Sequence, residues 1–141
     1  MTLQKILSSK GRQVYSIEPD KSLQDVVNML VDCNCGSLIV CENDRMVGII
    51  TERDILRACA ELDEPLSSIP VAVRMTRDVV TCTPDCDIET IMGMMTEHRV
   101  RHMPLLAGDR LAGMISIGDI VKAKHDELSL ENHYLKSYIQ S

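Results

Sequence analysis

The feature of the sequence that most constrains its fold is an internal repeat at an offset of 65 positions. Residues 48–54, GIITERD, return as residues 113–119, GMISIGD, and the register holds without a gap from Val14/Val79 to Ala58/Ala123. A solenoid needs three or more short repeats to bury its faces, whereas two long units can close on each other. The repeat therefore predicts two similar units related by a pseudo-twofold axis.

Each unit has the hydrophobic pattern of strand, helix, strand, strand, helix. Ser22 can cap a helix with one apolar face, and Asp87 takes the same place in the copy. In the first unit the elements are expected at residues 14–17, 22–31, 37–41, 46–50 and 52–61. In the second unit the first strand is expected at residues 79–82, and the last helix at Ser116 and beyond.

The fold class predicted from this pattern is α/β (α+β), with the two units packed sheet to sheet because each element carries a single apolar face. The predicted boundaries are residues 1–64 for the first unit with an N-terminal helix, 65–125 for the second unit, and 126–141 for a C-terminal helical extension. The segment 63–70, rich in proline and small polar residues, is expected to connect the units.

Composition argues against two classes of partner. The 141 residues include no Phe and no Trp, and the net charge is -6, so neither stacking platforms nor a basic surface for nucleic acid is expected. No stretch approaches the roughly 20 apolar residues that a membrane span needs, and the N-terminal residues lack the apolar core of a signal peptide. We expect a cytoplasmic protein without a membrane or nucleic-acid partner.

The six cysteines have two readings. Cys33, Cys41, Cys59 and Cys82 lie in or beside apolar runs, which is typical of small buried side chains in a reducing compartment. The alternative is a metal or thiol-redox module that uses Cys33 and Cys35 with Cys82 or Cys86, although no paired zinc spacing is present.

The repeated motif places a hydroxyl and a carboxylate at the start of a helix, as Thr51 with Asp54 and Ser116 with Asp119. One reading is a capping box, which stabilises the helix and nothing more. The other is a ligand site, because a helix N-terminus offers N–H groups to a phosphate and a nearby carboxylate can bind a ribose diol. Both readings stay open at this point.

The two motifs, together with residues 75–79 (MTRDV), residues 100–105 (VRHMPL) and the unbroken repeat, resemble a tandem pair of CBS domains, also called a Bateman module. The resemblance covers nearly the whole chain. It implies two clefts between the units for an adenosine-containing ligand: AMP, ADP, ATP, NAD or S-adenosylmethionine. It also implies a regulatory sensor that signals by a conformational change.

Carried onto this sequence, the resemblance predicts two sets of ligand-binding residues. The set for the first cleft is Ser16, Ile17, Pro19, Gly36, Ser37, Leu38, Thr51, Arg53 and Asp54. The set for the second cleft is Thr81, Thr83, Pro84, Arg99, Arg101, His102, Met103, Pro104, Ser116 and Asp119. The shared residues predict ribose binding in both clefts, and the mismatched cations predict that the clefts differ. Exposed, solvated charges are the alternative for the arginines, and a structural role is the alternative for His102.

No catalytic set competes with this interpretation, because neither the dinucleotide-binding nor the phosphate-loop glycine pattern is present and the four histidines are scattered. We expect a binding protein, not an enzyme. The last helix carries Val121, Leu128 and Leu135 at a spacing of seven, which predicts a homodimer contact. Alternatives are a docking surface for a regulated enzyme or transporter, and a purely structural dimerisation module.

Overall fold

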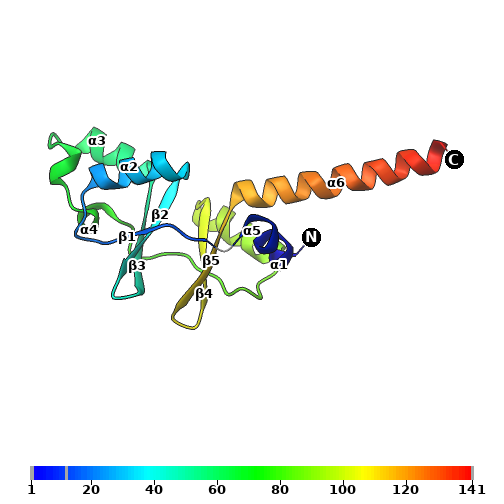
Figure 1. Ribbon diagram of the computed structural model, residues 1–141, viewed down its shortest axis with the longest axis horizontal. Coiled ribbons are helices and arrows are strands. Elements are labelled where there is room, and N and C mark those ends of the chain that lie inside the picture. Colours follow the sequence, from blue (N-terminus) through cyan, green and yellow to red (C-terminus); the bar gives the residue numbers. More distant parts are fainter. Residues whose placement is uncertain (1, 12, 141) are drawn as a thin grey trace. The chain divides into compact units, whose positions relative to one another are not determined.

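The computed structural model describes residues 2–11 and 13–140, which group into two compact units. The first-repeat unit comprises residues 13–79 with the hairpin tip 108–111. The second-repeat unit comprises the described residues of 1–12 and 112–141 together with residues 80–107. The mixed α/β fold and the C-terminal helix predicted from the sequence are confirmed (Figure 1).

The first-repeat unit is built on a three-stranded sheet in the order β1-β2-β3. β1 (Ser16–Ile17) runs parallel to β2 (Ser37–Glu42), which pairs antiparallel with β3 (Arg45–Thr51). The helices of this unit are α2 (Leu23–Cys33), α3 (Glu52–Glu61), the 3-10 turn η1 (Leu66–Ser68) and α4 (Val71–Arg74). Asn43 and Asp44 have positive φ at the β2–β3 turn, the conformation that matches the twist of a tight hairpin.

The segment after α3 closes the first-repeat unit. Thr76 exchanges two backbone hydrogen bonds with Ile49, at 2.8 and 2.9 Å, and so covers the edge of β3. Gly48 is required there, because a Cβ atom at this position would lie 2.7 Å from the Thr76 carbonyl oxygen. The predicted connector 63–70 therefore contributes to the core of this unit through Ile69, which is 2% exposed.

The second-repeat unit has a smaller sheet. β4 (His102–Ala107) pairs with β5 (Arg110–Ser116), and the helices are α1 (Leu3–Lys10), α5 (Ile88–His98) and α6 (Ile117–Gln140). Leu3, Ile6 and Leu7 of α1 lie in the core of this unit. The N-terminal helix thus packs with the second repeat, although it precedes the first in the chain. The boundaries at residues 64 and 125 follow the sequence repeat and stay a prediction.

The strand predicted at residues 79–82 is reduced to one parallel bridge between Cys82 and Leu105. In the first repeat the Ile39 N–H donates to the Tyr15 carbonyl oxygen at 3.0 Å. The residue at the Ile39 position in the second repeat is Pro104, which has no N–H to donate. The prediction of a full strand was therefore wrong, and the missing donor explains why.

The helix α6 is 24 residues long and buries only Ile120. Beyond the start of α6, the apolar side chains lie largely exposed, with Val121 60%, Leu128 63% and Leu135 58% accessible. Figure 1 shows α6 running on past α1 and α5 of its own unit. Within the described residues, no helix is both long and apolar enough to cross a membrane.

Candidate functional site at the two helix starts

The start of α3 is a complete capping box. The Thr51 N–H donates to Asp54 Oδ2 at 2.9 Å, and the Thr51 hydroxyl accepts the Asp54 N–H at 3.4 Å. The Thr51 hydroxyl also donates to Asp54 Oδ2 at 3.2 Å. The structure therefore confirms the capping geometry, and it records no bond to Asp54 Oδ1 from the rest of the described chain. That oxygen is the one a ligand could use.

The start of α6 repeats this arrangement with one addition. The Ser116 N–H donates to Asp119 Oδ2 at 2.9 Å, and the Ser116 hydroxyl accepts the Asp119 N–H at 3.1 Å. The ammonium group of Lys10, from α1, lies 2.6 Å from the same Oδ2 and donates to the Met114 carbonyl oxygen at 2.8 Å. The carboxylate of the second repeat is thus already paired, whereas none of the ion pairs among the described residues involves Asp54.

The environment of Asp119 lowers the pKa of its carboxyl. Burial alone would raise this pKa, because it penalises the charged form, but the hydrogen bonds from Lys10 and Ser116 and the charge of Lys10 outweigh it. The side chain is 22% exposed and that of Lys10 is 31% exposed. Asp119 is therefore held as a carboxylate.

The helix starts offer fewer free N–H groups than the sequence predicted. The Glu52 N–H donates to the Gly36 carbonyl oxygen at 3.1 Å, and the Ile117 N–H donates to that of Arg101 at 2.9 Å. The third N–H of each helix, from Asp54 or Asp119, donates to the capping hydroxyl. In the first three residues of each helix this leaves the backbone N–H of Arg53 or Gly118 for a ligand. A phosphate bound here would need side-chain cations in addition.

Backbone carbonyl groups of two predicted ligand-binding residues, Pro19 and Pro84, are also occupied. The Pro19 carbonyl oxygen accepts the Ala72 N–H at 3.0 Å, and the Pro84 carbonyl oxygen accepts the Gln4 side-chain amide at 3.3 Å. Ser16 and Thr83 are exposed, Thr81 is half-buried, and Ile17 is buried. The exposed side chains of Ser16 and Thr83 can thus change their contacts when a ligand arrives.

The middle strands supply backbone more than side chains. Leu38 and Met103 are 0% exposed and belong to the cores of their units, and Pro104 is buried. Ser37 is the one buried polar residue among the described side chains, and its strand neighbour across the sheet is Thr51. The structure therefore gathers Gly36, Ser37, Thr51 and Asp54 at one end of the β2–β3 hairpin. Their role in binding a ligand stays a prediction.

Of the predicted cations, Arg53, Arg99 and Arg101 are exposed. Arg99 has φ 55° at the C-cap of α5, the position that Asn34 occupies with φ 51° after α2. The fold fixes this backbone turn in both repeats, and the arginine side chain is carried on it. His102 is half-buried and engaged with another residue.

Sequence reasoning missed a groove beside Asp119. The groove has a volume of about 420 Å³ and lies between α1 and α6. It is lined by three lysines, Lys5, Lys10 and Lys122, and by three carboxylates, Asp119, Asp126 and Glu127. Ile6 and Leu130 supply apolar walls. Carboxylates and ammonium groups in equal number thus share one concave surface of the second-repeat unit, which offers a carboxylate for a diol but no net positive charge for a phosphate. The signal in the sequence is weak, because Lys5 and Lys10 precede the repeat.

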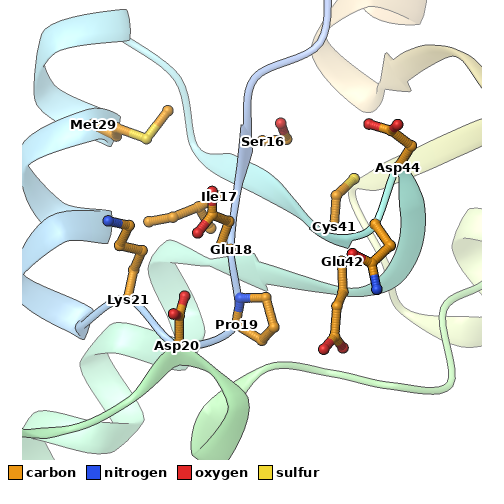
Figure 2. A pocket seen from close by; sticks show the side chains of 11 residues that line it. Ser16, Ile17, Glu18, Pro19, Asp20, Lys21, Met29, Cys41, Glu42 and Asp44 are labelled. Carbon is orange, nitrogen blue, oxygen red and sulfur yellow. The ribbon is translucent and has the colours of Figure 1, made fainter.

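A larger pocket of about 700 Å³ lies at the other end of β2 in the first-repeat unit (Figure 2). It contains Ser16, Ile17 and Pro19 but neither Thr51 nor Asp54. Its charged side chains are Glu18, Asp20, Lys21, Glu42 and Asp44. Four carboxylates against one ammonium group repel phosphate, so the size of this pocket does not make it the better nucleotide site.

The cysteines differ from the expectation of buried free thiols. Cys82 is 9% exposed but forms a disulfide with Cys86. Cys59 is exposed, and Cys33, Cys35 and Cys41 are half-buried free thiols. Burial, the charge of Cys33, and Glu52 raise the pKa of Cys35, and burial and Asp44 raise that of Cys41. The described residues hold no group of three metal-binding side chains.

Similarity to known proteins identifies the family of this chain. The CBS domain family matches residues 10–61 and 66–126, which are the two repeats. The chain belongs to the CBS domain family. It carries two CBS domains in tandem, and the resemblance inferred from the sequence is confirmed.

Individual CBS proteins resemble this chain over most of its length. The mitochondrial CBS domain-containing protein CBSX3 of Arabidopsis thaliana is 33% identical over 148 residues, which cover 99% of this chain and 72% of the relative. A CBS-domain-containing protein of Agrobacterium tumefaciens, known from a crystal structure, is 37% identical to this chain in sequence. The two structures match with a TM-score of 0.84 over 88% of this chain and 99% of the Agrobacterium chain.

A third CBS domain pair was crystallised with 5′-methylthioadenosine and S-adenosyl-L-methionine. It is 21% identical, covers 90% of this chain and 98% of that one, and has a TM-score of 0.79. At this identity the likeness shows the fold alone.

Proposed function

We propose that this protein is a non-catalytic regulatory sensor that binds an adenosine-containing ligand at the start of α3 and at the start of α6. The ligand class comprises AMP, ADP, ATP, NAD and S-adenosylmethionine. Binding changes the conformation of the unit that holds the ligand, and a regulated enzyme or transporter reads that change.

The observation that carries the proposal is the duplicated hydroxyl–carboxylate pair with the same bonds in both repeats. In each, Oδ2 of the aspartate accepts the N–H of the capping residue at 2.9 Å. A cap needs only that oxygen, so Oδ1 is left to accept hydroxyl groups. A vicinal ribose diol offers two hydroxyl donors close together, which suits a carboxylate in this position.

The ligand class is supported by the family. The CBS domain pair with two adenosyl compounds bound has the same fold as this chain. The α1–α6 groove of about 420 Å³ is within the size range of small-molecule sites, about 300–1,000 Å³. Its three lysines are balanced by Asp119, Asp126 and Glu127, so its charge does not select among the five ligands.

The two sites are proposed to differ in affinity. Within residues 2–11 and 13–140 no cation forms an ion pair with Asp54, whereas Asp119 is paired with Lys10 at 2.6 Å. A ligand that uses Oδ1 of Asp119 therefore meets a carboxylate whose charge is already shared with Lys10 on Oδ2. The site at α3 is expected to bind the ribose more readily.

Calorimetric titration with the five ligands tests the proposal. At least one is expected to bind, and no heat from any of them up to about 1 mM would refute it. Asp54→Ala should weaken binding at α3 by about 1.5–3 kcal/mol, the scale of a hydrogen bond to a charged group. Asp25→Ala is the matched control, because Asp25 forms a capping box with Ser22 outside the repeated motif.

If Asp54→Ala and Asp25→Ala lower stability alike and neither changes binding, the carboxylates serve only as caps. In that case the sensor proposal fails at its central residue.

We further propose that the protein forms a homodimer through α6. The support is the row of exposed apolar side chains on one helix, which a second copy of the same helix could cover. Sedimentation of the wild type and of Leu128→Glu tests this, since the variant should sediment as a monomer. A monomeric wild type would contradict the proposal.

A further inference from the structure

The disulfide between Cys82 and Cys86 spans the turn that leads into α5. This turn carries Thr83 and Pro84, two of the residues proposed to serve the second ligand site. The described ranges contain no equivalent link in the first repeat, where the corresponding residues are Ile17 and Lys21. The repeat thus provides an internal comparison for what the disulfide does.

The turn itself does not need the disulfide. In the first repeat the Lys21 N–H donates to the Glu18 carbonyl oxygen at 3.3 Å, and in the second the Cys86 N–H donates to that of Thr83 at 3.1 Å. Both following helices are capped by a side chain, Ser22 in one and Asp87 in the other. The same turn therefore forms with and without the covalent bond.

What differs is how the turn is anchored. In the first-repeat unit, residues 69–72 hold it by backbone bonds: the Val71 N–H donates to the Lys21 carbonyl oxygen at 2.8 Å, and the Leu23 N–H donates to that of Ile69 at 2.9 Å. In the second-repeat unit, α1 takes this place, and the recorded bond from α1 to the turn is the Gln4 side chain on Pro84. The disulfide thus substitutes for backbone anchors.

The two sulfur atoms differ in access. Cys82 is buried, and its backbone is fixed to β4 by bonds with Pro104 and Leu106. Cys86 is half-buried between the exposed Asp85 and Asp87, and the Thr83 hydroxyl lies 3.5 Å from its sulfur. A reductant can therefore approach Cys86, and Cys82 is the leaving group.

We propose that Cys82 and Cys86 form a reversible redox site, reducible by a dithiol, that controls the order of the turn at residues 83–87. Its effect on ligand binding rests on the proposed function. One thiolate of the dithiol attacks Cys86 Sγ, and Cys82 leaves as a thiolate that takes a proton from water. The second thiol then resolves the mixed disulfide and releases Cys86, so two electrons and two protons pass to the protein.

The half-buried thiols are poorer candidates for this chemistry. A raised thiol pKa leaves less thiolate at neutral pH, and this applies to Cys35 and Cys41. Cys33→Ser/Cys35→Ser is therefore the matched control, since it removes two thiols and keeps the disulfide. Cys82→Ser/Cys86→Ser mimics the reduced state permanently.

The first test needs no ligand. The folded protein is equilibrated with oxidised or reduced dithiothreitol and alkylated, and the number of alkyl labels is measured by mass spectrometry. The reduced form is expected to gain two labels, on Cys82 and Cys86, and hydrogen exchange in residues 83–87 is expected to rise about threefold or more. The same segment of the first repeat, residues 18–22, should be unchanged. Free thiols under oxidising conditions, or unchanged exchange after reduction, would overturn the proposal.

The second test asks whether the redox state reaches the ligand. AMP is titrated into Asp54→Ala in both redox states, so that only the site at α6 is observed. Reduction is expected to weaken binding about threefold or more, with no change in the Cys82→Ser/Cys86→Ser background. Equal affinities would refute this coupling. If AMP binds neither form, the proposed binding of AMP at α6 is refuted. The hydrogen-exchange measurement still tests the redox site by itself.

Discussion

The ion pair between Lys10 and Asp119 leads to a prediction that distinguishes the two ligand sites. If Lys10 competes with the ribose for the carboxylate, then Lys10→Met should strengthen ligand binding at α6. The methionine keeps the apolar length of the side chain and removes the ammonium group. The effect should be confined to the second-repeat unit, because Lys10 bonds to Met114 and Asp119 of that unit.

The magnitude follows from the geometry of the pair. The atoms are 2.6 Å apart, but both side chains are partly exposed, at 31% and 22%, so solvent screens the attraction. Exposed ion pairs contribute about 0.2–1 kcal/mol, and this one, with its extra bond to the Met114 carbonyl oxygen, belongs at the upper end. Removing the competitor should therefore improve affinity by about 1 kcal/mol, or about fivefold.

The assay is calorimetric titration of AMP into Asp54→Ala with and without Lys10→Met. Lys5→Met is the control, because Lys5 lines the same groove but forms no ion pair within the described residues. It removes the same charge without freeing Asp119. Lys10→Met should also lower the melting temperature by about 2–4 °C, since the pair is lost from the folded state.

Two results would refute the reasoning. Affinity that falls in Lys10→Met more than in Lys5→Met would mean that Lys10 binds the ligand, most simply its phosphate, instead of competing with it. Unchanged affinity in both variants would mean that Asp119 does not contact the ligand.

Two further predictions concern stability. Because the pKa of Asp119 is lowered in the folded state, its contribution to stability is present above the unfolded-state value of 3.8 and is lost as the pH falls through the folded-state value. The free energy of unfolding, measured by chemical denaturation between pH 6 and pH 3, should therefore fall more in the wild type than in Lys10→Met. Parallel curves of this free energy against pH would contradict the prediction. Gly48→Ala should destabilise the protein by about 1–3 kcal/mol, because the new Cβ would meet the Thr76 carbonyl oxygen at 2.7 Å. Gly93→Ala, in the open on α5, should be neutral or stabilising by up to about 1 kcal/mol, and equal losses from both alanines in thermal melts would refute the steric argument.

Much of the fold follows from local patterns. The capping residues Ser22, Thr51 and Asp87 were predicted from short-range spacing, and the structure has each of them at the start of a helix. Such caps depend on hydrogen bonds between residues three apart, so the local sequence suffices to specify them. The strand at 79–82 failed because Pro104, a partner distant in the sequence, lacks an N–H group.

The sequence by itself determined the repeat, the family and the two hydroxyl–carboxylate pairs. Tertiary structure decided that these pairs are not equivalent. Lys10 bonds to Asp119, 109 positions away in the chain, and no pattern of neighbouring residues predicts this ion pair. The Cys82–Cys86 bond likewise depends on where two side chains point after the turn has formed. Hydrogen bonds between residues three apart form the same capping motif in both repeats. Long-range packing then pairs the second copy with Lys10, and among the described residues no cation pairs with Asp54 of the first copy.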